Sequence, residues 1–365
     1  MRSSHGLSVT LLGPDIAHRT MFEAMLAGRA AKVTGLSDSL SLLRSRPRST
    51  GQRIQKLFDQ LTHTHDSSFL ENTCRHLDEN QTDIIIAYWG TGPLADIVAI
   101  KRLRPRIKIL LEVACFPLAL DTLGVKRQHW LMRHAAPSLD GMLYPSAMMR
   151  DYFHENVLGA RGRHLHELIL KICWPRELQV AAERNEQGID HPNLIFIGRT
   201  DLSHPTVHAA DDLRPLMAEI LENQIELHHG SSPETSDGHP YRRPFQPLEM
   251  AALIARMAAH DASLIAYNAA ACGRTERLNL TVPDRLATSV AAGIPIAIPS
   301  MGYAGPKQYL AEYPAVLEFD SVPDLKRKLE DRQHIQALRQ ATWQARKLYT
   351  AEAQGDLLAQ FLESL

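Results

Sequence analysis

The sequence has few cysteines, no long apolar run and almost no net charge, and each absence excludes a class of protein. The formal net charge of −1 gives no reason to expect nucleic acid or an anionic membrane as a partner. No apolar run is long enough to span a bilayer, and the first six residues lead into a strand-like run rather than a signal peptide. The cysteines are too widely spaced for a metal motif, which favours reduced thiols in a cytoplasmic protein: Cys74, Cys115, Cys173 and Cys272.

The 365 residues are enough for two domains, and apolar runs alternate with helical patterns in both halves of the chain. A hydrophobic fraction of 44% and a charged fraction of 22% are typical of a soluble globular protein. Residues 7–12 and 107–114 are expected strands of the first half, and residues 192–199 open a second alternating half. This alternation predicts an α/β fold built from doubly wound parallel sheets.

Residues 278–299 carry the clearest local pattern, which reads as loop, helix, tight turn and strand. Pro283 suits the first turn of a helix, and Asp284 is favourable at the positive end of the helix dipole. Gly293 predicts a left-handed cap, and residues 294–298 form a short apolar strand. A helix N-terminus at the carboxyl edge of a parallel sheet is a potential anion site, although a strand–helix unit without a ligand has the same local pattern.

This segment combines Pro-x-Arg-Leu, a helix of small residues, Ala-Ala-Gly-Ile-Pro and an apolar strand. In this it resembles the donor-binding segment of GT-B glycosyltransferases, nearest the family-4-like bacterial enzymes that build capsules, lipopolysaccharide and other glycans. The resemblance implies two Rossmann-like domains facing a cleft, with a C-terminal helix that crosses back to the first domain. It implies no bound cofactor and no catalytic metal. The co-substrate would be a UDP- or GDP-linked sugar, and the acceptor a glycan, a lipid-linked molecule or a protein.

On this basis the chain is expected to divide into four parts. Residues 1–175 would form an acceptor domain, and residues 176–191, which are rich in charge, a linker. Residues 192–342 would form the donor domain. Residues 343–365 would form a helix that packs back towards the first domain.

The resemblance also implies where the donor binds. Gly198 and Arg199 match a strand-Gly-Arg entry in which the arginine neutralises the diphosphate of the donor, so Arg199 is a candidate catalytic residue. Further donor-binding candidates lie on edge loops or on the helix that follows them: Asn268, Asn279, Thr281, Pro283, Arg285 and Thr288.

The sequence departs from the family pattern at positions that matter for mechanism. No lysine follows Arg199 within residues 200–205, and Leu280 and Thr288 occupy the places of the two glutamates of the retaining branch. The strand at 107–114 is followed by Cys115 rather than by the usual histidine. A non-catalytic sugar- or nucleotide-binding partner of another transferase therefore stays open, as does a nucleotide-sugar epimerase of related fold.

The first half contributes acceptor-side candidates at Gly13, Asp15 and His18. Glu112 is a second catalytic candidate, because a carboxylate inside an apolar run must be paired or protonated, although a structural pairing with an arginine explains it as well. The basic stretch around residues 44–61 leaves a peripheral membrane contact open.

Two histidines have a spacing that would permit metal ligation. His164 and His166 share one strand face, but no third ligand is suggested nearby, so no metal site is predicted. No sequence feature predicts an oligomeric state.

Overall fold

The computed structural model describes residues 6–38, 67–119, 121–179, 191–198, 209–230, 238–271 and 275–365. The chain forms two compact units. Unit 1 comprises Met1–Ile172 together with Ala351–Leu365, and unit 2 comprises Cys173–Thr350. The polypeptide therefore leaves unit 1 once and returns to it for its final helix.

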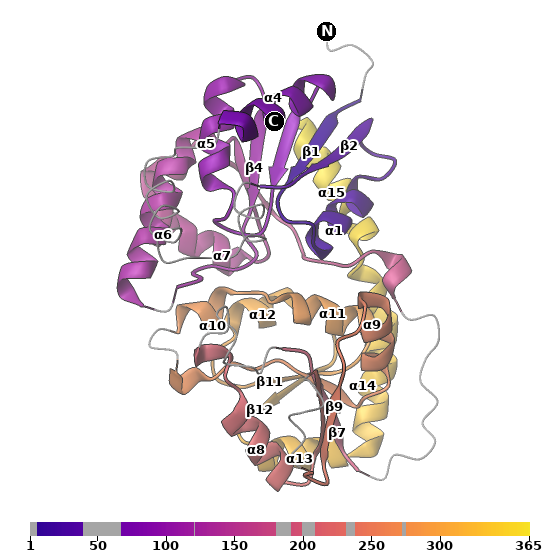
Figure 1. Ribbon diagram of the computed structural model, residues 1–365. Coiled ribbons are helices and arrows are strands. Elements are labelled where there is room, and N and C mark those ends of the chain that lie inside the picture. Colours follow the sequence, from indigo (N-terminus) through magenta and orange to yellow (C-terminus); the bar gives the residue numbers. More distant parts are fainter. Residues whose placement is uncertain are drawn as a thin grey trace. The chain divides into compact units, whose positions relative to one another are not determined.

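Within the described residues, unit 1 is a six-stranded parallel sheet in the order β2-β1-β3-β4-β5-β6, surrounded by helices (Figure 1). The strands are β1 (Ser8–Leu12), β2 (Lys32–Leu36), β3 (Ile84–Ala87), β4 (Lys108–Glu112), β5 (Gly141–Tyr144) and β6 (His166–Ile169). The helices are α1 (Ala17–Leu26), α4 (Ser67–Glu79), α5 (Leu94–Leu103), α6 (Thr122–Ala135), α7 (Ala147–Tyr152) and α15 (Ala351–Glu363).

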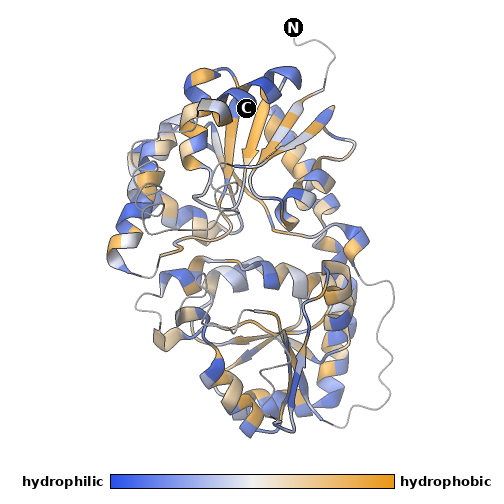
Figure 2. Ribbon diagram, in the orientation of Figure 1, coloured by the Kyte–Doolittle hydropathy of each residue, from blue (hydrophilic) through white to orange (hydrophobic). Residues whose placement is uncertain are grey.

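The strands at the centre of this sheet are buried along almost their whole length. β3 is a continuous apolar run, and β1 and β4 are mostly apolar and almost fully buried, as expected for parallel strands that are covered on both faces. Figure 2 shows the middle of this sheet mostly in the hydrophobic colour, whereas the surrounding helices carry both colours. The α/β class and the parallel sheet predicted from the sequence are confirmed for unit 1.

The final helix α15 packs on α1, so the expected return of the C-terminal helix is confirmed (Figure 1). The two helices come close at Gly355, where a Cβ atom would lie 2.5 Å from the carbonyl oxygen of Met25. Arg29 Nε donates a hydrogen bond of 2.7 Å to Asp356 Oδ1 across the same contact. The last segment of the chain is thus an integral part of unit 1.

Within the described residues, unit 2 is also a six-stranded parallel sheet, in the order β12-β11-β10-β7-β8-β9. The strands are β7 (Asn193–Phe196), β8 (Glu226–Gly230), β9 (Arg242–Phe245), β10 (Ala262–Leu264), β11 (Ile296–Pro299) and β12 (Val316–Phe319). The helices are α8 (Arg214–Glu222), α9 (Met250–Ala258), α10 (Glu276–Leu280), α11 (Asp284–Ala292), α12 (Ala304–Tyr309), α13 (Val322–Glu330) and α14 (Arg332–Ala345).

The pattern at residues 278–299 is largely confirmed. α11 begins at Asp284 with Pro283 at the N-cap position, and it ends at Gly293, whose φ of 66° and ψ of 41° are those of a left-handed cap. The expected loop before this helix is wrong in part, because Glu276–Leu280 closes a short helix, α10. Buried leucines at both of its apolar positions explain why tertiary packing holds this turn in helical form.

The expectation of one helix over residues 343–365 is also wrong. α14 runs to Ala345, a 3₁₀ turn follows at Arg346–Leu348, and α15 starts only at Ala351. Gly355 lies inside α15, where its missing side chain permits the close approach to α1.

Each sheet contains a point where the order of the strands reverses. In unit 1 the chain runs from β1 to β2 on one side and then to β3 on the other. In unit 2 it runs from β7 through β8 to β9, and then places β10 on the other side of β7. Open α/β sheets bind ligands beyond the carboxyl ends of the strands at such reversals. The ends of β7 and β10 are therefore the first place to look for a site in unit 2.

Candidate functional site

The guanidinium group of Arg285 lies at the reversal point of the unit 2 sheet. Arg285 Nη2 donates a hydrogen bond of 2.8 Å to the carbonyl oxygen of Ala266, just beyond the end of β10. The guanidinium carbon is 4.3 Å from the centre of the Tyr267 ring and 5.5 Å from that of the Phe196 ring at the end of β7. A cation is therefore held by aromatic faces and a carbonyl at the position where α/β sheets bind their ligands.

A second arginine stands beside the same tyrosine. The guanidinium carbon of Arg277, on α10, is 5.9 Å from the centre of the Tyr267 ring, and Nη2 lies 3.7 Å from Asp211 Oδ1. Arg277 is buried to more than nine-tenths. Two buried or half-buried guanidinium groups around one ring produce a local positive potential, which the carboxylate of Asp211 offsets only in part.

The N-terminus of α11 adds to this potential. The first N–H groups of a helix have no partner within the helix, and the helix dipole gives this end a partial positive charge. Pro283 is extended and contributes no N–H, and the Leu286 N–H bonds back to the Pro283 carbonyl oxygen at 2.8 Å. Arg285, one of the first residues of α11, thus places its charge beside the positive end of its own helix.

Two of the other donor-side candidates, Asn268 and Thr288, have structural contacts of their own. Asn268 Oδ1 accepts a hydrogen bond of 3.2 Å from the Ala271 N–H and so closes a local turn. Thr288 Oγ1 donates to the Asp284 carbonyl oxygen at 2.9 Å and accepts from Trp174 Nε1 at 2.9 Å. The only hydroxyl hydrogen of Thr288 is therefore used inside unit 2.

The remaining donor-side candidates follow β7 or lie on and directly after α10. Gly198 follows β7, and a Cβ atom there would lie 2.3 Å from Cζ of the Phe196 ring. Asn279 is on α10, and Thr281 is buried immediately after it. Arg199 lies outside the described residues, as do the basic stretch at residues 44–61 and Cys272.

The acceptor-side candidates of unit 1 surround the ring of Tyr88, just beyond β3. A Cβ atom at Gly13 would lie 2.7 Å from this ring, so the position requires glycine. The Tyr88 hydroxyl donates to the Pro14 carbonyl oxygen at 2.6 Å and accepts from Arg19 Nε at 3.0 Å. Burial raises the pKa of Tyr88 to about 12, so this hydroxyl stays protonated. Asp15 is exposed, 3.4 Å from Arg19 Nη1.

His18 of α1 and Glu112 of β4 lie close together. The two residues are far apart in the sequence, and no spacing pattern predicted this contact. His18 Nδ1 lies 3.6 Å from Glu112 Oε2, and both side chains are buried. Glu112 Oε2 also accepts a hydrogen bond of 3.0 Å from the Trp89 N–H, and the Glu112 carbonyl oxygen accepts from the Gly90 N–H at 3.2 Å. Trp89 has a φ of 70°, which is rare for a bulky residue. Glu112 therefore holds a strained loop at the reversal point of unit 1.

No model of a known protein family matches the chain, and no curated protein sequence matches it. Solved structures do resemble it. Sucrose-phosphate synthase from Thermosynechococcus elongatus gives a TM-score of 0.68 at 13% identity, over 98% of each chain. An α,α-trehalose-phosphate synthase (UDP-forming) from Burkholderia xenovorans, in complex with glucose-6-phosphate, gives 0.63 at 12% identity, over 98% of this chain and 100% of that chain. HepE from Anabaena, in complex with UDP, gives 0.61 at 10% identity, over 98% and 100%.

The chain has the GT-B fold. This confirms the fold implied by the resemblance of residues 278–299. Because the identities are low, the match establishes the GT-B architecture, and the chemistry must be argued from the side chains of this chain.

Within this GT-B chain, sequence reasoning missed two residues of the unit 2 site. Arg277 comes shortly before α11, but only the fold brings it to Tyr267. The Tyr303 hydroxyl accepts a hydrogen bond of 2.7 Å from the Tyr267 N–H, and the two rings stack with centres 6.3 Å apart. Tyr303 has a φ of 59°. The strain at this tyrosine, after a strand end, is a feature that no local sequence pattern predicts.

A metal site has no support among the described residues. No group of three or more histidine, cysteine, aspartate or glutamate side chains in these parts of the chain is arranged to hold an ion. Among the same residues, no helix is both long and apolar enough to cross a membrane.

Proposed function

We propose that this protein is a glycosyltransferase that moves a sugar from a nucleotide-sugar donor to an acceptor. The observation that carries the proposal is the position of Arg285 and Arg277 around Tyr267, at the reversal point of the unit 2 sheet. The GT-B structures that resemble the chain include a UDP-forming synthase and a protein in complex with UDP, which supports UDP rather than GDP as the nucleotide.

The diphosphate of the donor would bind beside these two guanidinium groups and the N-terminus of α11. One guanidinium group can donate two parallel hydrogen bonds to two phosphate oxygens. Such charge-assisted hydrogen bonds are stronger than those between neutral groups. When the bond between the sugar and the diphosphate breaks, negative charge grows on the leaving oxygen. Cations and helix N–H groups that are already in place stabilise that charge without reorganisation. Arg199 is proposed as a further diphosphate ligand, on the resemblance alone.

Glu112 receives a different proposed role from the catalytic one that the sequence suggested. Its carboxylate is buried against His18 and the Trp89 N–H. We propose that it acts as a positioning residue, which fixes the loop after β3 and with it the indole of Trp89 on the acceptor side. The proposed acceptor is a hydroxyl group of a glycan, a lipid-linked molecule or a protein.

The test is calorimetric titration of the full chain with UDP and with GDP. Arg285→Ala removes one guanidinium group, and the loss of a charged hydrogen bond is expected to weaken binding by about 10- to 100-fold, because such bonds contribute about 1.5–3 kcal/mol. Arg327→Ala is the matched control, since it removes an exposed arginine of the same unit that pairs with Asp324. Thermal unfolding without ligand checks that both variants fold.

Two results would overturn the proposal. A folded wild-type protein that binds neither nucleotide has no donor site, and equal UDP affinity in wild type and Arg285→Ala would place the site elsewhere. Mass spectrometry of UDP-sugar reactions then separates the remaining functions. Release of UDP with a glycosylated product indicates transfer, conversion of the sugar nucleotide alone indicates an epimerase, and tight binding without turnover indicates a non-catalytic partner.

A further inference from the structure

Helix α6 of unit 1 exposes two large apolar side chains on one side. Leu123 is 79% exposed and Trp130 is 46% exposed. They are seven residues apart, so they lie on the same side of the helix, two turns from each other. The opposite side carries Val125 and Met132, which are buried in unit 1. α6 therefore packs on unit 1 through one apolar face and exposes a second apolar face to solvent.

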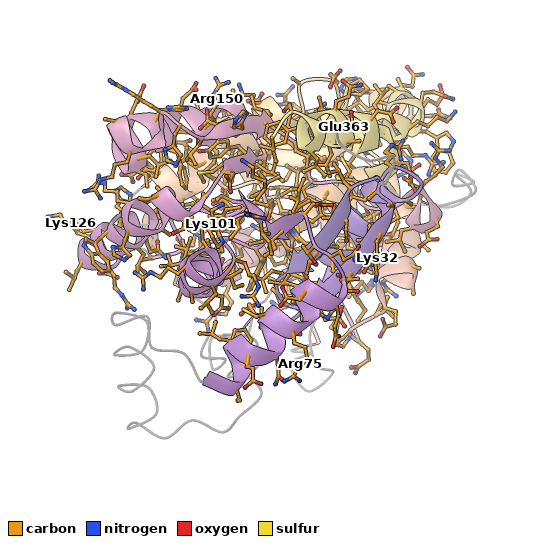
Figure 3. All side chains as sticks on the ribbon, turned by 90° about the horizontal axis from the view of Figure 1, so that it is seen from above. Lys32, Arg75, Lys101, Lys126, Arg150 and Glu363 are labelled. Atoms are coloured by element: carbon orange, nitrogen blue, oxygen red, sulfur yellow. The ribbon has the colours of Figure 1, made fainter. Side chains whose placement is uncertain are left out.

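Basic side chains lie on both sides of the exposed pair. Lys126 and Arg133 are on one side of the line from Leu123 to Trp130, and Arg127 and His134 are on the other, as the helical repeat requires. Figure 3 shows Lys126 on the outer side of α6, pointing away from the body of unit 1. Residues 122–135 contain no aspartate or glutamate, although the whole chain has a formal net charge of −1. The positive charge is thus a local property of this helix.

Some of these groups hold the helix in place while the others face outward. Arg133 Nη2 donates to the Asn156 carbonyl oxygen at 2.9 Å, which ties the C-terminal end of α6 to the neighbouring turn. The Trp130 indole stacks on the His134 ring, with centres 5.4 Å apart. The presented surface is therefore an arrangement of leucine and tryptophan flanked by lysine and arginine side chains.

We propose that this face of α6 binds the surface of an anionic phospholipid bilayer. Helices that lie in the membrane interface place leucine and tryptophan among the acyl chains and direct lysine and arginine to anionic headgroups. Tryptophan is favoured at this interface because its ring is apolar and its N–H is polar. An acidic protein partner would satisfy the cations, but the leucine and tryptophan at the centre of the face favour a bilayer. The proposal does not rest on the proposed glycosyltransferase activity.

The charge pattern predicts the size of the effect. Each basic residue near an anionic surface strengthens binding by about fivefold. With two or three such residues in contact, binding to anionic vesicles should exceed binding to neutral ones by about 25- to 125-fold. The difference should shrink as salt screens the charges.

The experiment is co-sedimentation of the full chain with large vesicles, either of phosphatidylcholine alone or of phosphatidylcholine with phosphatidylglycerol. Wild type should bind the anionic vesicles, and Leu123→Glu and Trp130→Glu should each lower binding by about tenfold or more. Lys126→Glu tests the electrostatic contribution to vesicle binding, because Lys126 is an exposed residue of α6. Met301→Glu is the matched control, because Met301 is 89% exposed in unit 2 and should not affect vesicle binding.

Each outcome decides the matter. Absence of binding to anionic vesicles, equal binding to neutral ones, or unchanged binding of Leu123→Glu and Trp130→Glu would overturn the proposal. Calorimetry with UDP in solution is run on the same variants. Unchanged UDP binding with lost vesicle binding supports the membrane surface independently of the donor site, and failure of UDP binding in wild type would count only against the proposed activity.

Discussion

Gly293, the residue that ends α11, offers a test of how tightly this helix is held in unit 2. Its φ of 66° favours glycine, and a Cβ atom there would lie 3.1 Å from Arg346 Cδ and 3.2 Å from Trp343 Cε3. Thr342 Oγ1 also donates a hydrogen bond of 3.0 Å to the Gly293 carbonyl oxygen. Gly293→Ala therefore adds both a strained backbone and a crowded contact.

The two costs can be separated with a control in the same unit. Gly238 has a φ of 71° and nothing within 4 Å of its added Cβ, so Gly238→Ala adds backbone strain alone. A left-handed alanine costs about 1–2 kcal/mol, of which the reduced freedom of the unfolded chain returns about 0.4–1 kcal/mol. Overpacking adds about 1–3 kcal/mol. We expect Gly238→Ala to destabilise unit 2 by about 1 kcal/mol and Gly293→Ala by about 2–4 kcal/mol.

Thermal unfolding followed by circular dichroism measures the difference. For a domain of this size, each kcal/mol lowers Tm by about 2–4 °C, so Gly293→Ala should lower it by roughly 5–15 °C. Gly293→Asn should fall between glycine and alanine in backbone strain, because asparagine tolerates the left-handed region. Equal losses in Gly293→Ala and Gly238→Ala would refute the crowded contact, and no loss in either would refute the backbone argument.

Two further changes test packing and charge. Gly355→Ala places a Cβ atom 2.5 Å from the Met25 carbonyl oxygen and 2.6 Å from Arg29 Cζ. This substitution should separate α15 from α1 and raise proteolytic cleavage near the C-terminus. Unchanged resistance to protease would contradict this expectation. Burial lowers the pKa of His228 below its ordinary value. As the pH falls, the imidazole is therefore protonated in the unfolded chain before it is protonated in the folded one. The stability of unit 2 should fall as the pH drops from about 7 through the folded pKa. His228→Gln should flatten this pH dependence in denaturant titrations, and an unchanged slope would show that other groups cause it.

Local patterns predicted the parts of the fold that depend on local physics. The alternation of apolar runs and helical segments predicted the parallel sheets, because strands covered on both faces are mostly apolar. The cap at Gly293 was predicted because few residues other than glycine accept its backbone conformation. α10 was missed because a helix of this length depends on the packing of Leu278 and Leu280 rather than on propensity.

The sequence predicted only those site residues whose position depends on the local pattern of the chain. Arg285 was a candidate because it lies at the start of a helix after an edge loop. The contact of Arg277 with the same Tyr267 ring depends on how α10 packs, and sequence spacing carries no information on it. In the same way, His18 Nδ1 and Glu112 Oε2 are 3.6 Å apart only because the fold brings α1 and β4 together. Contacts between distant residues require the fold to be known first.

The return of α15 to unit 1 has a consequence for the order of folding during synthesis. Unit 2 is one continuous stretch, Cys173–Thr350, whereas unit 1 needs residues from both ends of the chain. The ribosome adds about 5–20 residues per second from the N-terminus, and domains generally fold in that order. Here the first unit to be started cannot be completed before unit 2 has been made, because its α1 surface lacks α15 until Ala351–Glu363 has been synthesised. Nascent unit 1 therefore exposes the surface around Met25 and Arg29, which Gly355 later approaches, for the whole time that unit 2 is being made.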